Sequence, residues 1–472
     1  MSRRRLLAAL AVVAGILVAA PQSALAHGLV GRQDLPIPKW LFGWAATVVL
    51  VASFVGLAVL WPRPRLESPA ERRTISVPRL LDGLCGAIGV AIFALLVYAG
   101  FAGSQTTTNN ITPTFVFVIF WVGLAIVSML FGDLFKAFNP WRAIARAVAA
   151  VASMGGRRTL PAPMPYPVAL GRWPAAAGIL AFAWVELVYS GRTDPSNLAV
   201  LMLACAAVQL VGMSLYGIET WNRYGDAFGV YFGLFARMSP LRWERGALYR
   251  RLPLSGLTTL DPVPGTVALL CVMIGTTSFD GFSAGPSWGE IAPRMTDSLR
   301  SLGLAQATAL EVAFTIGLVV VVAVIAGLFR LGITGMRGAA GAKEPTDALA
   351  ARFAHTLVPI ALAYVVAHYF SLLAYQGQAM FYLVSDPLGE GANIFGSAKT
   401  TIDYSWISAT SIWYVQVAAL VIGHVAGLIL AHDRALIAFK DGRTATRSQY
   451  WMLAVMIAFT SLGLWLLSAA NA

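Results

Sequence analysis

Ten apolar runs of about the length that crosses a lipid bilayer, the sixth of them short, constrain this chain more than any other feature of its sequence. A transmembrane helix needs about 20 predominantly apolar residues, and only helices and closed barrels satisfy their backbone polar groups in lipid. Barrel strands are shorter and alternate in polarity, whereas these runs are continuous. We therefore predict an all-α fold, a polytopic transmembrane helix bundle. The runs cover residues 41–61, 82–102, 112–132, 172–189, 197–217, 264–279, 310–330, 355–377, 410–432 and 451–470.

The amino terminus has the three parts of a secretory signal peptide. A basic start (Arg3–Arg5) precedes an apolar stretch (Leu6–Ala20) and the small-residue sequence Ala24–Ala26. We expect cleavage after Ala26, so that residues 1–26 are removed and residues 27–472 form a single bundle domain. The mature amino terminus is then His27, and it lies outside the cell.

The excess of basic residues follows this topology. Of the 34 Lys and Arg residues, 25 fall in or beside the loops expected inside, six lie in outward segments and three in the signal peptide. Cytoplasmic loops of membrane proteins carry such an excess. Together with a content of only 12% charged residues, the pattern predicts a multi-pass protein of the cell membrane with lipid as a partner. It predicts no nucleic-acid partner, because no basic-aromatic binding module accompanies the charge.

Ionisable residues inside the spans are costly, so they are the candidates for function. We favour the set expected near the outer face. The inner set is expected to make helix caps and ion pairs, and His424, between Gly423 and Gly427, is expected to mark a close helix contact. The outer set contains Glu186, Asp280, Glu311 and His368, with Asp386 and Asp403 in a loop, and the inner set contains Asp82, Asp133, His355, His432 and Asp433.

One span carries a polar stripe. Tyr364, His368, Ser371 and Tyr375 are spaced by four, three and four residues, which places them on one face of a helix. Because the rest of this span is apolar, we expect the stripe to face protein or water.

The sequence also suggests a metal site that includes some of these ionisable residues. A histidine at a free amino terminus offers its α-amine and its imidazole as two ligands. We therefore expect His27 and His368, with a carboxylate such as Asp280 or Glu186, to hold a divalent transition metal. The sequence does not distinguish zinc from copper.

Residues 226–238 are rich in aromatic side chains but too short to span the membrane. Arginines follow this segment, which favours a position in the inner interface against anionic lipid. A re-entrant segment is the alternative.

Several longer motifs resemble bacterial membrane proteins catalogued as fenitrothion hydrolases. The resemblance covers nearly the whole chain after residue 26, and it implies hydrolysis of an aryl phosphorothioate triester to a nitrophenol and a dialkyl thiophosphate. The motifs are Ala-His-Gly-Leu-Val-Gly-Arg-Gln-Asp-Leu-Pro-Ile-Pro (26–38), Phe-Asn-Pro-Trp-Arg (138–142), Val-Tyr-Phe-Gly-Leu-Phe-Ala-Arg (230–237), Leu-Asp-Pro-Val-Pro-Gly-Thr (260–266), Ser-Phe-Asp-Gly-Phe (278–282), Val-Pro-Ile-Ala-Leu-Ala-Tyr-Val-Val-Ala-His-Tyr-Phe (358–370), Val-Ser-Asp-Pro-Leu-Gly (384–389) and Gly-His-Val-Ala-Gly-Leu-Ile-Leu-Ala-His-Asp-Arg-Ala (423–435).

The leading functional hypothesis is a membrane-bound hydrolase with its site on the outer face. A metal would supply hydroxide for attack on phosphorus. Alternatively, Asp280 or Glu186 would act as a general base, with Tyr364 or Tyr375 donating to the developing charge. Phe395, Tyr404 and Trp406 would form an aromatic rim for a small apolar aryl substrate.

Two other functional classes stay open. A transporter or metal-handling permease would use the same histidine and carboxylates as an ion path. A scaffold subunit would need a partner membrane protein.

Overall fold

The computed structural model describes residues 39–67, 70–154, 163–244, 246–439 and 441–470. The predicted signal peptide and His27 lie outside these residues. From Ile37 to Ala472 the chain forms one compact unit. The described part of this unit is mostly helical, which confirms the predicted fold class at that level.

Within the described residues, eight helical segments are long and apolar enough to cross a membrane, so the chain is a membrane protein. The count of ten spans is not confirmed: the predicted run 172–189 forms the shorter α8 (Trp173–Leu187), and the run 451–470 lies within α19 (Gly442–Ala470). The eight segments contain α2 (Lys39–Leu60), α3 (Arg79–Ala102), α4 (Ile111–Thr114) with η1 (Phe115–Gly123) and α5 (Leu124–Phe131), α9 (Pro195–Tyr216), α12 (Thr266–Ser283), α14 (Gln306–Ala340), α15 (Thr346–Phe353) with η2 (Ala354–Thr356), α16 (Leu357–Gln376), η3 (Gly377–Ala379) and α17 (Met380–Ser385), and α18 (Ala409–Ala438).

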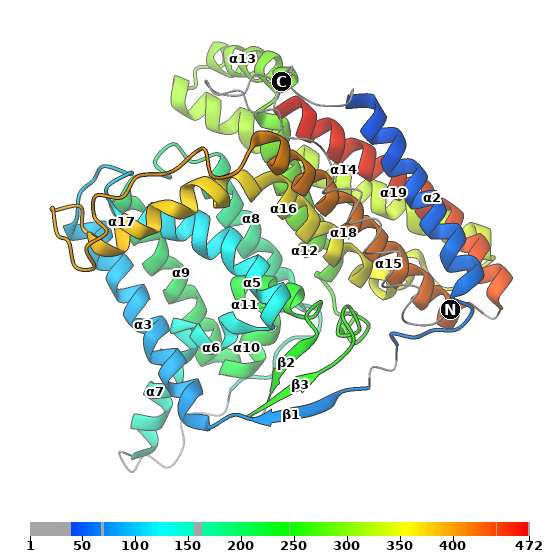
Figure 1. The fold of residues 1–472 in the computed structure, drawn as a ribbon, viewed down its shortest axis with the longest axis horizontal. Coiled ribbons are helices and arrows are strands. Elements are labelled where there is room, and N and C mark those ends of the chain that lie inside the picture. Colours follow the sequence, from blue (N-terminus) through cyan, green and yellow to red (C-terminus); the bar gives the residue numbers. More distant parts are fainter. Residues whose placement is uncertain (1–38, 68–69, 155–162, 245, 440, 471–472) are drawn as a thin grey trace. The chain divides into compact units, whose positions relative to one another are not determined.

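Shorter elements connect these helices. At one end of the unit lie α7, α10 and a small antiparallel sheet with strand order β1-β3-β2 (Figure 1). The sheet joins the segment after α2 to the segment after α11. We call this end the basic end because each of these elements carries at least one arginine. The shorter elements are α6 (Leu134–Phe138), α7 (Pro140–Met154), α10 (Ile218–Tyr224), α11 (Ala227–Ala236), α13 (Pro286–Ser301), β1 (Arg72–Ser76), β2 (Leu241–Glu244) and β3 (Ala247–Arg250).

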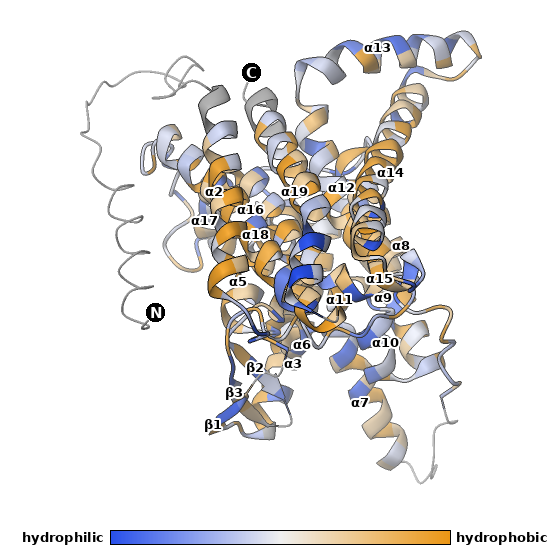
Figure 2. Cartoon of the chain, turned by 90° about the vertical axis from the view of Figure 1, so that its right-hand side faces the viewer, coloured by the Kyte–Doolittle hydropathy of each residue, from blue (hydrophilic) through white to orange (hydrophobic). Residues whose placement is uncertain are grey.

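Apolar residues line the long helices, while hydrophilic residues gather on β1 and on much of α13 (Figure 2). In an amphipathic helix such as α13, the polar face seeks water or headgroups. The helices α2, α18 and α19 contact one another, and α12 contacts α8, α14 and α16. The helix α12 is therefore central, and 72% of its residues are buried inside the protein.

The short helix α11 lies within the protein rather than along a membrane surface. Eight of its ten residues are buried, whereas a helix lying in the interface would expose one face to lipid. The prediction that residues 226–238 lie in the interface is therefore wrong, and the re-entrant alternative agrees with this burial. The helix begins at Asp226, whose carboxylate accepts bonds from the Gly229 amide and from the side chains of Asn139 and Trp141.

The contact between α16 and α18 confirms the interpretation of His424. A Cβ on Gly423 would lie 2.3 Å from the Ala363 Cβ, and one on Gly427 would lie 3.0 Å from the Thr356 carbonyl oxygen. The two glycines therefore permit close approach of the helices. His424 is fully buried beside them, and its Nδ1 lies 2.7 Å from the Leu420 carbonyl oxygen of its own helix.

Candidate functional site

Two of the predicted site residues form a direct pair inside the membrane region. The Nε2 atom of His368 on α16 lies 2.8 Å from the Oδ2 atom of Asp280 on α12. Each side chain retains 22% of its solvent exposure, so the pair is not sealed inside the core. A hydrogen-bonded histidine and carboxylate can hold, donate or accept a proton.

A third predicted residue, Glu186, stands beside this pair. It lies one residue before the end of α8, and its carboxylate interacts electrostatically with Asp280. Tyr369, which follows His368 on α16, interacts with both carboxylates through its hydroxyl group. We call Glu186, Asp280, His368 and Tyr369 the polar cluster.

Two aromatic residues border the polar cluster. Trp121 and Tyr231 stack with their ring centroids 4.5 Å apart, and Tyr231 lies within electrostatic range of Glu186. Trp121 belongs to η1, a π-helical stretch of nine residues, and such stretches occur frequently at functional sites. The Tyr231 hydroxyl is buried and has no hydrogen-bond partner within the described part of the chain.

Little in the sequence pointed to these aromatic neighbours. Tyr369 was detectable only as a second polar group next to His368, and it falls outside the predicted stripe. Trp121 and Tyr231 lie in apolar segments where an aromatic side chain ordinarily serves packing. No sequence pattern placed them beside Glu186.

The predicted polar stripe does not gather in one place. The Tyr364 hydroxyl donates to the Phe459 carbonyl oxygen on α19 at 2.9 Å, and the Tyr375 hydroxyl donates to the Ile407 carbonyl oxygen at 3.0 Å. Both bonds tie a tyrosine to a neighbouring backbone. The structure therefore brings Glu186, Asp280 and His368 together and places Tyr364 and Tyr375 in separate contacts.

The loop expected to form an aromatic rim is ordered by its own turns. Asp386 accepts bonds from two amides of its loop, and Asp403 accepts bonds from Ser405. Phe395, Tyr404 and Trp406 are each more than half exposed. These carboxylates therefore stabilise the loop.

The metal hypothesis is not decided by the described residues. Among them, no group of three or more His, Cys, Asp and Glu side chains is arranged to hold a metal ion. His27, the other expected ligand, lies outside the described residues. A site built from His27, His368 and a carboxylate stays a prediction.

Most of the inner set makes the structural contacts that the sequence predicted. Asp433 accepts bonds from the Trp61 indole and from the amides of Arg65 and Leu66. Asp82 pairs with Arg142 and Arg146. Each of these carboxylates joins separate segments of the basic end.

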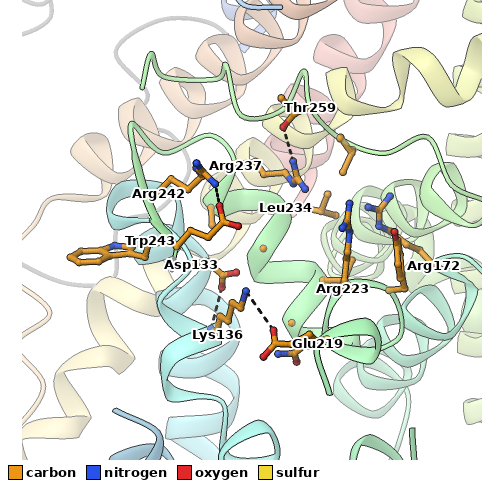
Figure 3. Close-up of a pocket in the computed structure, with 18 of the residues that line it drawn as sticks. Asp133, Lys136, Arg172, Glu219, Arg223, Leu234, Arg237, Arg242, Trp243 and Thr259 are labelled. Carbon is orange, nitrogen blue, oxygen red and sulfur yellow. Dashed lines mark hydrogen bonds and ion pairs between the residues drawn. The ribbon is translucent and has the colours of Figure 1, made fainter. Parts of the chain in front are cut away.

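A cavity of about 920 Å³ opens at the basic end, and α11 forms part of its wall (Figure 3). Its wall contains six basic and four acidic residues, so it is polar and carries a positive balance. The sequence did not predict it, because the wall comes from segments far apart in the chain. Its charged residues are Lys136, Arg172, Arg223, Arg237, Arg242, Arg251, Glu71, Asp133, Glu219 and Glu244.

Comparisons with protein-family models, with curated proteins and with solved structures found no match to this chain.

Proposed function

We propose that the protein is a proton-coupled permease in which the polar cluster carries the proton. The observation that supports this proposal best is the position of α11. One face of this helix contributes to the cavity at the basic end, and another face reaches the polar cluster. A single short helix thus separates a polar cavity from a protonatable group.

The residues of α11 divide between the two sides. Gly229, Val230, Gly233 and Leu234 line the cavity, whereas the Tyr231 ring stacks on Trp121 next to the polar cluster. The helix has ten residues, a length of about 15 Å, which is half of a hydrocarbon core. Short or broken helices near the membrane midplane are typical of substrate sites in transporters.

The helix α8 connects the two sites, which lie at opposite ends of it. Arg172 precedes the first residue of α8 and lines the cavity, whereas Glu186 lies near the other end of the same helix. Fourteen residues of helix correspond to a rise of about 21 Å. A substrate in the cavity and a proton at the cluster would therefore occupy separate positions along the bundle.

Aromatic rings of α11 pack against η1. The partly buried Phe120 ring packs edge to face on the buried rings of Phe228 and Phe232, with centroids 4.8 and 5.2 Å apart, and these two rings lie nearly parallel to each other at 6.3 Å. Such a layer blocks water while it is closed. In alternating access, movement of α11 would open this layer toward one side at a time.

The test uses purified protein in liposomes that contain a pH-sensitive dye. Addition of a small anion from a panel that includes phosphate and glycerol 3-phosphate should acidify the lumen at a rate that depends on the anion. Asp280→Asn, which keeps the shape of the side chain and removes its charge, should slow the acidification about tenfold or more. No anion-dependent pH change in wild-type liposomes would contradict the proposal.

The His368–Asp280 pair favours a second candidate, the membrane-bound hydrolase. When Asp280 is ionised, it accepts a bond from Nε2–H of His368, and the lone pair of the neutral ring lies on Nδ1. Nδ1 could then remove a proton from water. The hydroxide would form a bond to phosphorus of an aryl phosphorothioate triester while the bond to the aryloxide breaks.

Release of nitrophenolate by detergent-purified protein, without a gradient, tests the hydrolase. A metal analysis of the mature protein, with and without one alanine inserted between Ala26 and His27, tests the predicted ligand. If His27 chelates a metal, the insertion should lower metal content and activity together. Unchanged metal content would leave His27 as an ordinary first residue.

A further inference from the structure

The acidic residues of the basic-end cavity are engaged by partners of their own. Glu71 and Glu244 pair with Arg242, and Glu219 pairs with Lys136 at 3.8 Å and with Arg142 at 3.0 Å. The fourth, Asp133, caps α6 by accepting the Lys136 amide at 3.1 Å, and its charge acts on Lys136, Arg142 and Arg237. Three of the four carboxylates are therefore paired with other residues, and the fourth offsets only part of the remaining positive charge.

Arg172 and Arg237 hold the uncompensated charge. Within the described part of the chain, neither makes an ion pair with a carboxylate. Arg172 donates to the Asp261 carbonyl oxygen at 2.9 Å and to the Thr266 hydroxyl at 2.7 Å, and Arg237 donates to the Gly256 carbonyl oxygen at 3.1 Å and to the Thr259 hydroxyl at 3.0 Å. These neutral acceptors position the two guanidinium groups without neutralising them.

Burial makes this arrangement costly. Arg172 is only 2% exposed, and its Nε atom has no hydrogen-bond partner among the described residues. Burial and the nearby charge of Arg237 lower the pKa of Arg172 to about 10, and burial also lowers the pKa of Arg237. Arginine side chains stay charged at neutral pH. The cavity therefore holds two cations that repel each other, and the carboxylate of Asp261 offsets part of this repulsion.

The two arginines lie on the wall of one cavity. Arg172, Arg223 and Arg237 surround Leu234 near the end of α11 (Figure 3). Arg223 is already paired with Asp261, so it contributes little free charge. An anion that reached both Arg172 and Arg237 would relieve their repulsion.

We propose that this cavity binds an anion that bears a phosphate monoester group, and that this anion is the cargo of the permease. Arginine presents a planar set of donors that matches phosphate oxygens, and a doubly charged group matches two cations. A volume of about 920 Å³ exceeds the need of phosphate alone and suits a small organic phosphate. The rings of Tyr224 and Trp243 on the wall would contact its organic part.

Two sources carry this chemistry: a free phosphate monoester and the headgroup of an anionic phospholipid. The claim about cargo rests on the proposed function, whereas the claim about binding does not. Binding is measured in detergent without a gradient. Binding without transport would therefore overturn the permease and leave the site, and transport that ignores the cavity arginines would overturn the site.

The experiment measures binding of radiolabelled glycerol 3-phosphate and inorganic phosphate to the purified full-length protein. Arg237→Gln should weaken binding of glycerol 3-phosphate about tenfold or more, because one charge-assisted bond is lost. Arg237→Lys, which keeps the charge, should lose less. Arg250→Gln is the matched control: Arg250 is exposed on β3 at the same end and outside the cavity, and we expect a change within about twofold.

A second arm separates the two sources. The same proteins are placed in phosphatidylcholine nanodiscs with or without phosphatidate, and native mass spectrometry counts retained lipid. Retention of phosphatidate by the wild type, lost in Arg237→Gln and competing with glycerol 3-phosphate, would assign the site to a headgroup. If neither compound binds in a manner that depends on Arg237 in a protein with an unchanged size-exclusion profile, the proposal is overturned.

Discussion

Two aspartate and histidine neighbourhoods in this protein use the same side chains in opposite ways. In the first, at the basic end, Asp433 accepts three hydrogen bonds, from the Trp61 indole and from two backbone amides. His432 bonds the Trp61 carbonyl oxygen at 3.0 Å and the Gln449 side chain at 3.2 Å. In the second, Asp280 and His368 bond each other and retain partial exposure.

The difference lies in the partners. Asp433 and His432 are at most 1% exposed, and their hydrogen-bond partners are backbone groups, an indole and an amide, none of which titrates near neutral pH; the charge of Asp433 also acts on Glu67, to which it is not hydrogen-bonded. Such bonds hold chain segments in register. Asp280 and His368 have each other, with Glu186 close by, so a change of charge at one alters the next. Titratable partners, more than burial, distinguish a candidate for proton transfer from a structural contact.

The largest effect on stability is expected for Asp433→Asn. An asparagine has one acceptor oxygen, so its NH2 group would face either the Leu66 amide or the Trp61 indole and the Arg65 amide, and it cannot accept a bond from them. We expect a loss of about 3 kcal/mol in the free energy of unfolding, because charge-assisted bonds in a buried site are lost. Unfolding in mixed micelles measures it, with His368→Gln as the comparison. Equal free energies of unfolding for the two variants would contradict the difference between the structural Asp433 site and the Asp280–His368 pair.

A double-mutant cycle on Asp280→Asn and His368→Gln tests whether the two residues of the second neighbourhood act together in proton transfer. If the pair works as one unit, each single variant should lose most of the proton flux, and the double variant should lose little more. The cycle compares initial rates of acidification in liposomes that contain equal amounts of protein. Strictly multiplicative losses would show that the two residues act independently.

His424→Gln is expected to have a small effect. His424 makes one bond, to a carbonyl oxygen of its own helix, and its Nε2 has no partner among the described residues. Side-chain bonds in membranes contribute well under about 2 kcal/mol. Expression and flux should both survive, as judged by size exclusion and the liposome assay. A folded His424 variant without proton flux would indicate that the residues that carry the proton lie deeper in the bundle, near His424.

The smallest effect concerns pH at the basic end, where Glu67 pairs with Arg434. Burial raises the pKa of Glu67, although Arg434 acts in the opposite direction. The folded state therefore keeps the proton to higher pH than the unfolded state does. Stability should rise as pH falls through the raised pKa toward the ordinary value, and it should not rise further below that value.

Glu67→Gln should remove this contribution. The measurement compares the free energy of unfolding of the two proteins at neutral pH and at about pH 5, just above the ordinary glutamate value of about 4.3. An unchanged pH dependence would show that Glu67 does not titrate in this interval.

The sequence predicted the long helices well, because a spanning run must be apolar along its whole length. It did not predict the sheet. β1 pairs with β3, which lies more than 170 residues later, and all five residues of β1 are exposed. Such a strand lacks the alternation of a half-buried strand. The cavity was missed for the same reason, since the wall depends on long-range contacts.

The candidate site was partly predictable. Glu186, Asp280 and His368 stood out because ionisable residues are rare in spans. Periodicity was less useful: the spacing of Tyr364, His368 and Tyr375 places them on one side of α16, but three different neighbours pack along that side. The partner of each side chain depends on helix packing, which periodicity does not contain.

The most direct test of the account compares His368→Gln with His424→Gln in proton flux. Glutamine keeps hydrogen-bonding capacity and cannot exchange a proton near neutral pH. We predict that anion-dependent acidification of liposomes falls about 10²-fold or more in His368→Gln, while His424→Gln stays close to wild type. A His368→Gln protein that folds normally and acidifies the lumen at the wild-type rate would contradict the central claim.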